Sequence, residues 1–272
     1  MKVSAFLENI RTGAQSANLP LEKALSRIQA AGLETVYVGR DSIAELGQPL
    51  FEMLKKLGLP VEGLHGWFNF ADHPEGEDWK GFLDTASQVG AGHVLFVPGL
   101  VDTDDLEARR IKMENMVKVL RQAVAYGRER GIAVTMENLD QITAPYCSVA
   151  GLSWFFSQVE GLQCCYDTGN FIIHRENELT ALEGFLDNLA AIHVKDRSQV
   201  KLHAKDDHCQ CADGGIMYPA PVGYGCMQIS GILDKLKEVG YTGSLIAELY
   251  GYDPDFMLEG MEESVAWLKN HI

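Results

Sequence analysis

Four segments in the second half of the chain share one feature, an apolar stretch that ends in an acidic residue or a histidine. They are "TMENLD" with Glu137, "YDTGN" with Asp167, "IHVKD" with His193 and "IAELYG" with Glu248. One carboxylate at the end of an apolar strand loses hydration without compensation, whereas three carboxylates and one imidazole can share a divalent cation. An oxygen-rich set with one nitrogen and no sulfur favours Mn²⁺, Mg²⁺ or Co²⁺ over a structural zinc site. The four residues therefore predict one divalent metal ion, with Mn²⁺ as the first choice and Mg²⁺, Co²⁺ or Zn²⁺ as alternatives.

These side chains can meet only if the segments that carry them are neighbouring strands of one sheet. Eight strand-like apolar segments run along the 272-residue chain, each followed by a helix-like segment. They lie near residues 3–7, 35–39, 61–68, 93–99, 133–139, 162–169, 189–196 and 243–250. Several lack strict polar alternation, which suits strands that are covered on both faces. Eight β-then-α units with short turns predict an α/β fold, one closed (β/α)8 TIM barrel that forms a single domain over residues 1–272.

The helical segments favour this arrangement. Residues 105–131 place Ile111, Met116, Leu120 and Val124 on one face that we expect to point inward. An open doubly wound sheet is the alternative fold, but "FLENIRTGAQ" after the first strand lacks the G-x-G-x-x-G pattern of a dinucleotide site. In a barrel, active-site residues lie at the carboxyl ends of the strands, so the four candidate ligands should face one central point.

Each of the four residues has a more ordinary interpretation when it is taken alone. A single acid at a strand end more often caps the following helix or binds a loop, and a single histidine is often a hydrogen-bonded core residue. Four consecutive strands that all end in a metal ligand are much harder to explain in this way. The set as a whole therefore favours a metal site.

One connection departs from the short turns elsewhere. Residues 197–226, after the seventh strand, form a loop whose length is typical of a lid or a binding loop. Within it, His203, His208, Cys209 and Cys211 raise the alternative of a second metal site. The C-x-C spacing is not that of a zinc site and no second pair follows, so a mobile lid is the favoured interpretation.

Composition narrows the function classes. Hydrophobic residues make up 46% of the chain, which supports a large core, and no apolar run approaches the length of a membrane helix. The formal charge of −15, from 38 acids and 23 bases, disfavours nucleic-acid and membrane partners. The six cysteines are irregularly spaced and no export signal precedes them, so we expect free thiols and a cytoplasmic protein.

The motifs "ENLD", "DTGN", "IHVKD" with a later "PVGYG", and "IAELYG" together resemble the xylose isomerase-like TIM-barrel superfamily. The resemblance covers nearly the whole chain, and its nearest branch is the sugar phosphate isomerase/epimerase family, which includes the ketohexose 3-epimerases. It implies that Glu137, Asp167, His193 and Glu248 bind one divalent metal and that the two glutamates are also the catalytic acid and base. It further implies a small carbohydrate substrate and, as in many relatives, a homo-oligomer.

Five further residues are candidates for binding the substrate. His65 and Trp67 follow the third strand, where the family often has a substrate-binding histidine, although His65 is equally well explained as a packed rim residue. Lys195 lies two residues after His193 and should point to the same side of the strand. Asn170 stands where the epimerase branch usually has histidine, and Arg197 is the nearest match to an arginine found beyond the seventh-strand histidine. The departure at Asn170 puts a close copy of the epimerase contacts in doubt.

The chemistry that the resemblance implies is proton abstraction next to a carbonyl. A metal that holds the carbonyl oxygen and a neighbouring hydroxyl stabilises the enediolate that forms, while one glutamate removes the proton and the other returns one. Return to the same carbon gives epimerisation, and return to the adjacent carbon gives aldose–ketose isomerisation. The ligand set does not distinguish these outcomes. We therefore expect a metal-dependent sugar isomerase or epimerase.

Three other functions remain as alternatives. A lyase or dehydratase acting on a keto-sugar, an inosose or an oxidised glycoside would use the same site, with loss of a β-hydroxyl or of the glycosidic oxygen in place of reprotonation. An abasic-site endonuclease resembling endonuclease IV needs three zinc ions and more histidines, and Asn170 together with the acidic charge opposes it. A non-catalytic barrel predicts disrupted ligands, whereas all four are present.

Overall fold

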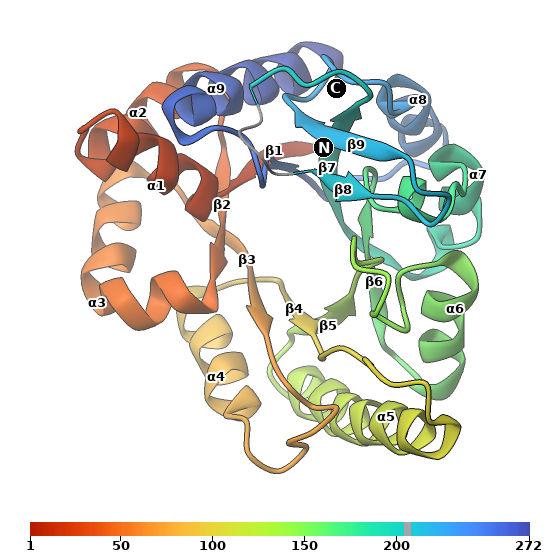
Figure 1. Cartoon of the computed structure of the whole chain (residues 1–272). Coiled ribbons are helices and arrows are strands. Elements are labelled where there is room, and N and C mark those ends of the chain that lie inside the picture. The colour runs from red at the N-terminus through yellow and green to blue at the C-terminus, as the bar shows by residue number, and fades with distance from the viewer. Residues whose placement is uncertain (204–207) are drawn as a thin grey trace.

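Eight parallel strands close into a barrel in the computed structural model, which describes residues 1–203 and 208–272 (Figure 1). Neighbouring strands follow the order of the chain from the first to the seventh, and the last strand pairs in parallel with both the seventh and the first. The barrel strands are β1 (Lys2–Phe6), β2 (Thr35–Gly39), β3 (Val61–Trp67), β4 (His93–Val97), β5 (Ala133–Met136), β6 (Gln163–Asp167), β7 (Leu189–Ser198) and β10 (Ser244–Glu248). The predicted (β/α)8 barrel is confirmed.

Helices surround the barrel and cover the outer face of its strands (Figure 1). They are α1 (Leu7–Ser16), α2 (Leu21–Ala30), α3 (Arg40–Leu57), α4 (Trp79–Val89), α5 (Leu106–Arg128), α6 (Val149–Gln158), α7 (Glu178–Glu183), α8 (Ile229–Glu238) and α9 (Pro254–His271), with short 3₁₀ turns at Phe171–His174 and Leu186–Asn188. Within the described residues, no helix is both long enough and apolar enough to span a membrane.

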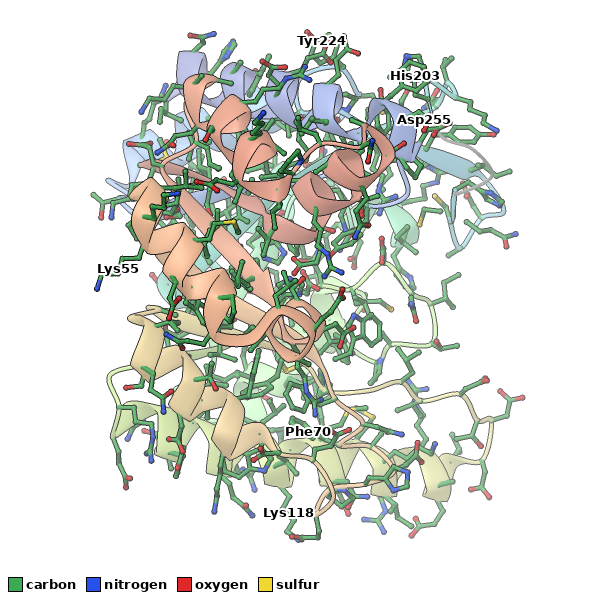
Figure 2. The ribbon with its side chains drawn as sticks, turned by 90° about the vertical axis from the view of Figure 1, so that its left-hand side faces the viewer. Lys55, Phe70, Lys118, His203, Tyr224 and Asp255 are labelled. Carbon is green, nitrogen blue, oxygen red and sulfur yellow. The ribbon has the colours of Figure 1, made fainter. Side chains whose placement is uncertain are left out.

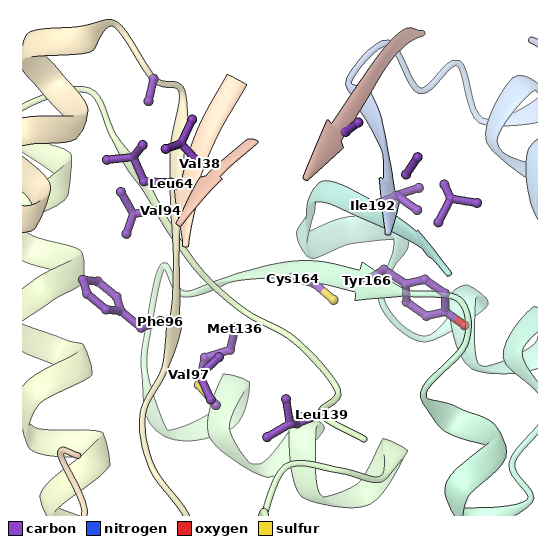
Figure 3. Close-up of a cluster of buried hydrophobic side chains, with 14 of the residues drawn as sticks. Val38, Leu64, Val94, Phe96, Val97, Met136, Leu139, Cys164, Tyr166 and Ile192 are labelled. Atoms are coloured by element: carbon purple, nitrogen blue, oxygen red, sulfur yellow. The ribbon is translucent and has the colours of Figure 1, made fainter. Parts of the chain in front are cut away.

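Alternate residues of each strand face opposite sides, so the barrel has two separate apolar layers. The larger lies between strands and helices, and Figure 3 shows part of it, with Val94 and Phe96 of β4 beside Met136 of β5. The smaller cluster comprises Phe6, Tyr37, Leu95, Cys165, Ala191 and Ile246, which alternate with the outward residues of their strands. It fills the barrel interior, and the next inward positions toward the carboxyl ends carry the candidate site.

Most predicted strands match the observed ones within a few residues, but two expectations need correction. Ile111 in α5 is 46% exposed, because it lies five residues before Met116 and therefore on the face of the helix that points away from the barrel. The second correction concerns α1, because the sequence pattern predicts one helix after each strand. It begins directly after β1 at Leu7, so two helices fill the first crossover.

The predicted loop over residues 197–226 is only partly a loop, because its described residues contain two short strands. β7 continues to Ser198, and β9 (Ile216–Ala220) pairs antiparallel with its end and with β8 (Cys209–Gln210). Cys209, Cys211 and Met217 are buried against Ile173, so this flap has a small core of its own. The four residues of the alternative second metal site, His203, His208, Cys209 and Cys211, all lie within the described part of the chain, and they form no group that could hold a metal ion there.

The flap and the long βα loops lie at one end of the barrel. In Figure 2, His203 and Asp255 lie at the end where the loops project, and Lys55, near the end of α3, lies at the other. The carboxyl ends of the strands therefore open toward the flap.

Candidate active site

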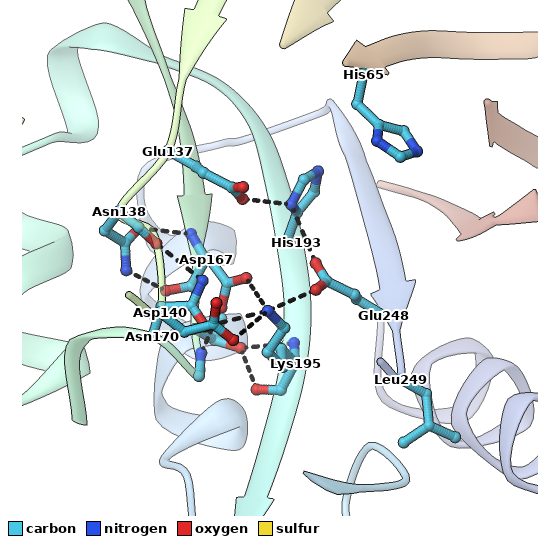
Figure 4. A network of polar contacts seen from close by, with 12 residues as sticks. His65, Glu137, Asn138, Asp140, Asp167, Asn170, His193, Lys195, Glu248 and Leu249 are labelled. Carbon is cyan, nitrogen blue, oxygen red and sulfur yellow. Dashed lines mark hydrogen bonds and ion pairs between the residues drawn. The ribbon is translucent and has the colours of Figure 1, made fainter. Parts of the chain in front are cut away.

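The four predicted ligands lie together at the carboxyl ends of their strands (Figure 4). Glu137, Asp167, His193 and Glu248 each offer a ligand atom within 4.8 Å of the others, and all four are buried. Within the described part of the chain they are the one such group of three or more metal-binding side chains. The strand register causes this convergence, because Asp167 pairs with His193 across β6 and β7, and Glu248 pairs with Lys195 across β10 and β7.

His193 is the centre of the cluster. Its Nδ1 atom lies 2.9 Å from Glu137 Oε2 and 3.3 Å from Glu248 Oε2, so both glutamates face the same edge of the ring. Burial alone would lower the pKa of His193, but the neighbouring Cys165 thiol and the hydrogen bonds to the two glutamates raise it well above its usual value. In the metal-free protein a proton on His193 therefore balances part of the negative charge.

Lys195 supplies the other balancing charge. Its Nζ atom lies 2.5 Å from Glu248 Oε1, 3.2 Å from Asp167 Oδ2 and 3.5 Å from Asp140 Oδ2. Burial alone would lower the pKa of Lys195, but these three carboxylates hold it well above its usual value, so the ammonium group stays charged. This lysine points into the cluster, as its position two residues after His193 predicts.

A layer of hydrogen bonds fixes the strand ends beneath the cluster. The side-chain amide of Asn138 donates to the carbonyl of Asp167 and accepts from its N–H, both at 3.0 Å, which joins the ends of β5 and β6. Asn170 Oδ1 accepts from Lys195 Nζ at 3.1 Å and from Arg197 at 3.3 Å. Arg197 also pairs with Asp140 at 2.5 Å. The hydrogen bonds of Asn138, Asn170 and Arg197 therefore hold Lys195 and the four candidate ligands in a fixed geometry.

Three carboxylates in so small a volume have unequal proton affinities. Burial raises the pKa of Asp167 to about 7, although Lys195 opposes this shift. Burial would likewise raise the pKa of Glu248, but Lys195 and His193 outweigh it and hold that pKa well below the usual range. Of these two carboxyl groups, Asp167 is therefore the one that more readily holds a proton in the metal-free protein.

These features fit a divalent cation. Asp167 Oδ2 is fully buried and accepts no hydrogen bond, although Lys195 Nζ lies 3.2 Å away, and such an orphaned oxygen is uncommon in folded proteins. Three carboxylates and one imidazole without sulfur form a donor set suited to Mn²⁺, Mg²⁺, Co²⁺ or Zn²⁺. The geometry alone does not select one of these ions.

A cavity of about 430 Å³ opens directly above the cluster. Its lining includes Glu137, Lys195 and Glu248 of the cluster and also Glu8, His65 and Trp67. A cavity of this size suits a small organic ligand. A larger cavity of about 630 Å³ lies between α3 and α4 and contains no comparable group of polar side chains, so we assign the chemistry to the smaller one.

The structure distributes the five predicted substrate-binding residues unequally. His65, Trp67 and Lys195 line the cavity, and Trp67 is 50% exposed at its rim. Asn170 and Arg197 are buried behind Lys195 and are not among the cavity-lining residues that the structure describes. Their observed contacts are with Lys195, Asp140 and the backbone of Gly169.

Comparison with known proteins identifies the family. The family model described as xylose isomerase-like TIM barrel matches residues 25–271. The chain belongs to this family. The predicted resemblance is therefore confirmed.

One curated relative of this chain is an inosose isomerase from Halalkalibacterium halodurans. It is 24% identical over 200 residues, which cover 71% of this chain. The match spans 64% of the length of that relative, so a part of the relative has no counterpart in the matched region.

Two solved structures superpose on nearly the whole chain. A D-allulose 3-epimerase from Methylomonas sp. superposes with a TM-score of 0.75 and 13% identity, covering 100% of this chain and 98% of the epimerase. A probable 3-DHS dehydratase, AsbF, from Bacillus anthracis gives a TM-score of 0.74 and 11% identity over 100% of both chains. At these identities the likeness shows the fold alone.

Three polar residues around the cavity were not singled out from the sequence. Asp140 pairs with Lys195 and Arg197, and it lies three residues after Glu137 in the "ENLD" motif. Tyr250 follows β10 and lines the cavity. Glu8 follows β1 and also lines the cavity. The strand-end rule that selected the four ligands finds Glu8 as well when it is applied to the first strand.

We expect Lys195→Met to destabilise the metal-free protein far more than the metal-loaded protein. The substitution leaves buried carboxylates without their cation, which costs about 3–5 kcal/mol, or roughly 10 °C in Tm for a chain of this size. Added Mn²⁺ supplies positive charge at the same place. Thermal unfolding in chelator and in Mn²⁺ measures the difference. The control is Lys56→Met, which removes an exposed pair with Glu22 and should change little. Equal Tm losses with and without metal contradict this account.

Metal affinity should fall as the pH drops from 8 to 6. A metal binds the ionised carboxylate and the neutral imidazole, whereas the pKa values of Asp167 and His193 are both raised in the metal-free fold. Protons therefore compete with the metal, and Asp167 alone accounts for about tenfold weaker binding per pH unit below 7. Calorimetric titration in two buffers of different ionisation enthalpy measures affinity and proton release together. An affinity that does not change over this range is incompatible with binding at this cluster.

Proposed function

We propose that this protein is a divalent-metal-dependent isomerase or epimerase of a sugar or sugar derivative. The observation that carries the proposal is that Glu137 and Glu248 both lie within 3.3 Å of His193 Nδ1, both buried and both at the wall of one cavity. Two carboxylates that flank one bound substrate are what removal and return of a carbon-bound proton require. Membership of the xylose isomerase-like family and the inosose isomerase among its relatives support the same chemistry.

In this proposal Glu137, Asp167, His193 and Glu248 hold the metal ion. When bound, the ion stabilises negative charge on the oxygens of an α-hydroxy carbonyl substrate as the adjacent carbon loses its proton. Mn²⁺ remains our first choice. Lys195 is charged and lies between Glu248 and Asp167, so it holds Glu248 ionised and ready to accept a proton.

The two glutamates divide the proton transfers. Glu248, whose pKa is held low, is ionised and serves as the base, while Glu137 returns a proton from the other side of the substrate. The reverse reaction exchanges these roles. His65, Trp67 and Lys195 contact the substrate, and Trp67 offers an apolar ring face to its C–H bonds. Asn170 and Arg197 support Lys195 from behind and act on the substrate through it.

An uncharged substrate suits the site better than a sugar phosphate. The cations near the cavity are already paired, Lys195 with three carboxylates, Arg197 with Asp140 and Arg40 with Glu77. A phosphate group would have to displace these carboxylates and would meet their negative charge. An inosose or a ketohexose, as in the names of two of the proteins similar to this one, fits this requirement. The expected homo-oligomer and cytoplasmic location stay predictions.

We expect metal-dependent deuterium uptake at the carbon next to the carbonyl. The protein is stripped with chelator, reloaded with Mn²⁺ and incubated in D₂O with inosose, D-allulose and other ketoses, and NMR follows the exchange. Glu137→Gln and Glu248→Gln should each lower the rate by at least about 100-fold, since each removes an acid–base group. Glu45→Gln, at an exposed carboxylate paired with Arg11, is the control.

The products separate the candidate reactions. An epimer or a shifted carbonyl supports the proposal, whereas an alkene or enone product assigns the protein to the lyases. No exchange on any substrate, with metal demonstrably bound, contradicts the proposed proton abstraction.

A further inference from the structure

A second pair of acid–base side chains lines the same cavity as the metal-ligand cluster. His65 Nε2 lies 3.1 Å from Glu8 Oε2, and both side chains line the cavity above the cluster. Figure 4 shows His65 apart from the network around Lys195. The two-glutamate mechanism gives neither residue a proton transfer, and we call this pair the Glu8–His65 dyad.

The fold holds the dyad in one arrangement. The N–H of Gly39, at the end of β2, donates to Glu8 Oε1 at 2.8 Å, so both oxygens of Glu8 are engaged. A Cβ atom on Gly39 would lie 2.8 Å from Glu8 Oε1 and 3.0 Å from His65 Cε1. No alanine fits there without moving the dyad. Glycine at this position therefore creates the space in which the carboxylate and the imidazole meet.

The dyad is poised for proton transfer and is accessible. Burial alone would raise the pKa of Glu8, but His65 and a hydrogen bond from Ser42 hold it below its usual range, so the carboxylate stays ionised. An ionised Glu8 can only accept at this contact, so His65 donates its Nε2–H to it, and the neutral form of the ring keeps Nδ1 as an acceptor. Its Nδ1 atom has no hydrogen-bond partner among the described residues and is left as an acceptor. The side chains of His65 and Glu8 are 14% and 20% exposed, whereas His193 is fully buried.

The dyad is also close to the cluster. The ring of Phe6 contacts His65 at a centroid distance of 4.7 Å and His193 at 4.8 Å, and the ring of Tyr37 contacts the same two histidines at 5.0 and 5.1 Å. Phe6 and Tyr37 therefore each contact both imidazoles. A substrate the size of a sugar that reaches the cluster also reaches His65.

We propose that His65, positioned by Glu8, transfers a proton between two substrate oxygens. This inference rests on the proposed function. The reaction is then a carbonyl shift between neighbouring carbons of an α-hydroxy ketone, as opposed to inversion at one carbon. Epimerisation moves protons only to and from carbon, for which the two glutamates suffice. A carbonyl shift also requires that one oxygen lose a proton and the other gain one.

The step balances without a further reactant. A glutamate takes the proton from carbon, and the electron pair of that C–H bond forms the enediolate double bond. His65 Nδ1 takes the proton from the hydroxyl oxygen, which becomes the new carbonyl oxygen, and returns it to the former carbonyl oxygen. The second glutamate protonates the former carbonyl carbon. Glu8 stays ionised throughout and stabilises the transient imidazolium, as a carboxylate behind a catalytic histidine does.

The experiment measures two rates in one sample of Mn²⁺-loaded protein in D₂O, with inosose and D-allulose as the probes. One rate is deuterium uptake into the unreacted substrate, and the other is formation of the shifted-carbonyl product. In His65→Gln and Glu8→Gln we expect product formation to fall about 100-fold or more while deuterium uptake falls less than about threefold. Gly39→Ala, which keeps both dyad residues and displaces them, should show the same uncoupling.

Controls separate a positioning role for Glu8 from a structural one. Glu8→Asp retains the carboxylate and should recover a measurable part of product formation. Glu45→Gln should leave both rates unchanged.

Three results contradict the dyad proposal alone. In the first, the dyad variants take up deuterium at the wild-type rate and also form product at the wild-type rate. In the second, the dyad variants lose both rates equally. The third is formation of an epimer, instead of a shifted carbonyl, by the wild-type protein. No deuterium uptake by the wild-type protein instead contradicts the proposed function, and the dyad proposal fails with it.

Discussion

The mutual repulsion of buried carboxylates is the constraint on which the rest of the site depends. Glu137, Asp167 and Glu248 lie with His193 inside a volume less than 5 Å across, away from water. Such an arrangement is unstable unless positive charge is placed within it. In the metal-free protein, Lys195 and protons on His193 and Asp167 supply that charge. In the proposed function, a divalent ion held by these residues would supply the same charge and would also stabilise negative charge on a substrate.

The barrel meets this constraint through strand register. Inward positions at the carboxyl ends of β5, β6, β7 and β10 come to one height because parallel pairing aligns Asp167 with His193 and Glu248 with Lys195. Apolar rings of the inner cluster, Phe6 and Tyr37 among them, fill the barrel below and exclude water. The same rings separate the metal-ligand cluster from the Glu8–His65 dyad, so one cavity is bordered by two acid–base systems.

The barrel and the four-residue cluster could be predicted from the sequence because both follow from local pattern. Eight apolar segments predict the strands, and one residue near the end of each of the last four predicts the ligands. The contacts of Asn170, Arg197 and Glu8 could not be predicted, since they depend on distances between segments far apart in the chain. Arg197 turns toward Asp140 because β7 continues to Ser198 and pairs with β9, a flap that the loop composition did not indicate. Glu8 meets His65 only because Gly39 leaves room for both.

The central claim is that the four strand-end residues form one metal centre, and anomalous diffraction from Mn²⁺-loaded crystals tests it most directly. The account predicts one anomalous peak per chain, with oxygens of Glu137, Asp167 and Glu248 and a nitrogen of His193 as ligands at about 2.0–2.3 Å. A peak elsewhere, such as in the flap between Ser198 and Cys226, or no peak at saturating Mn²⁺, would contradict it.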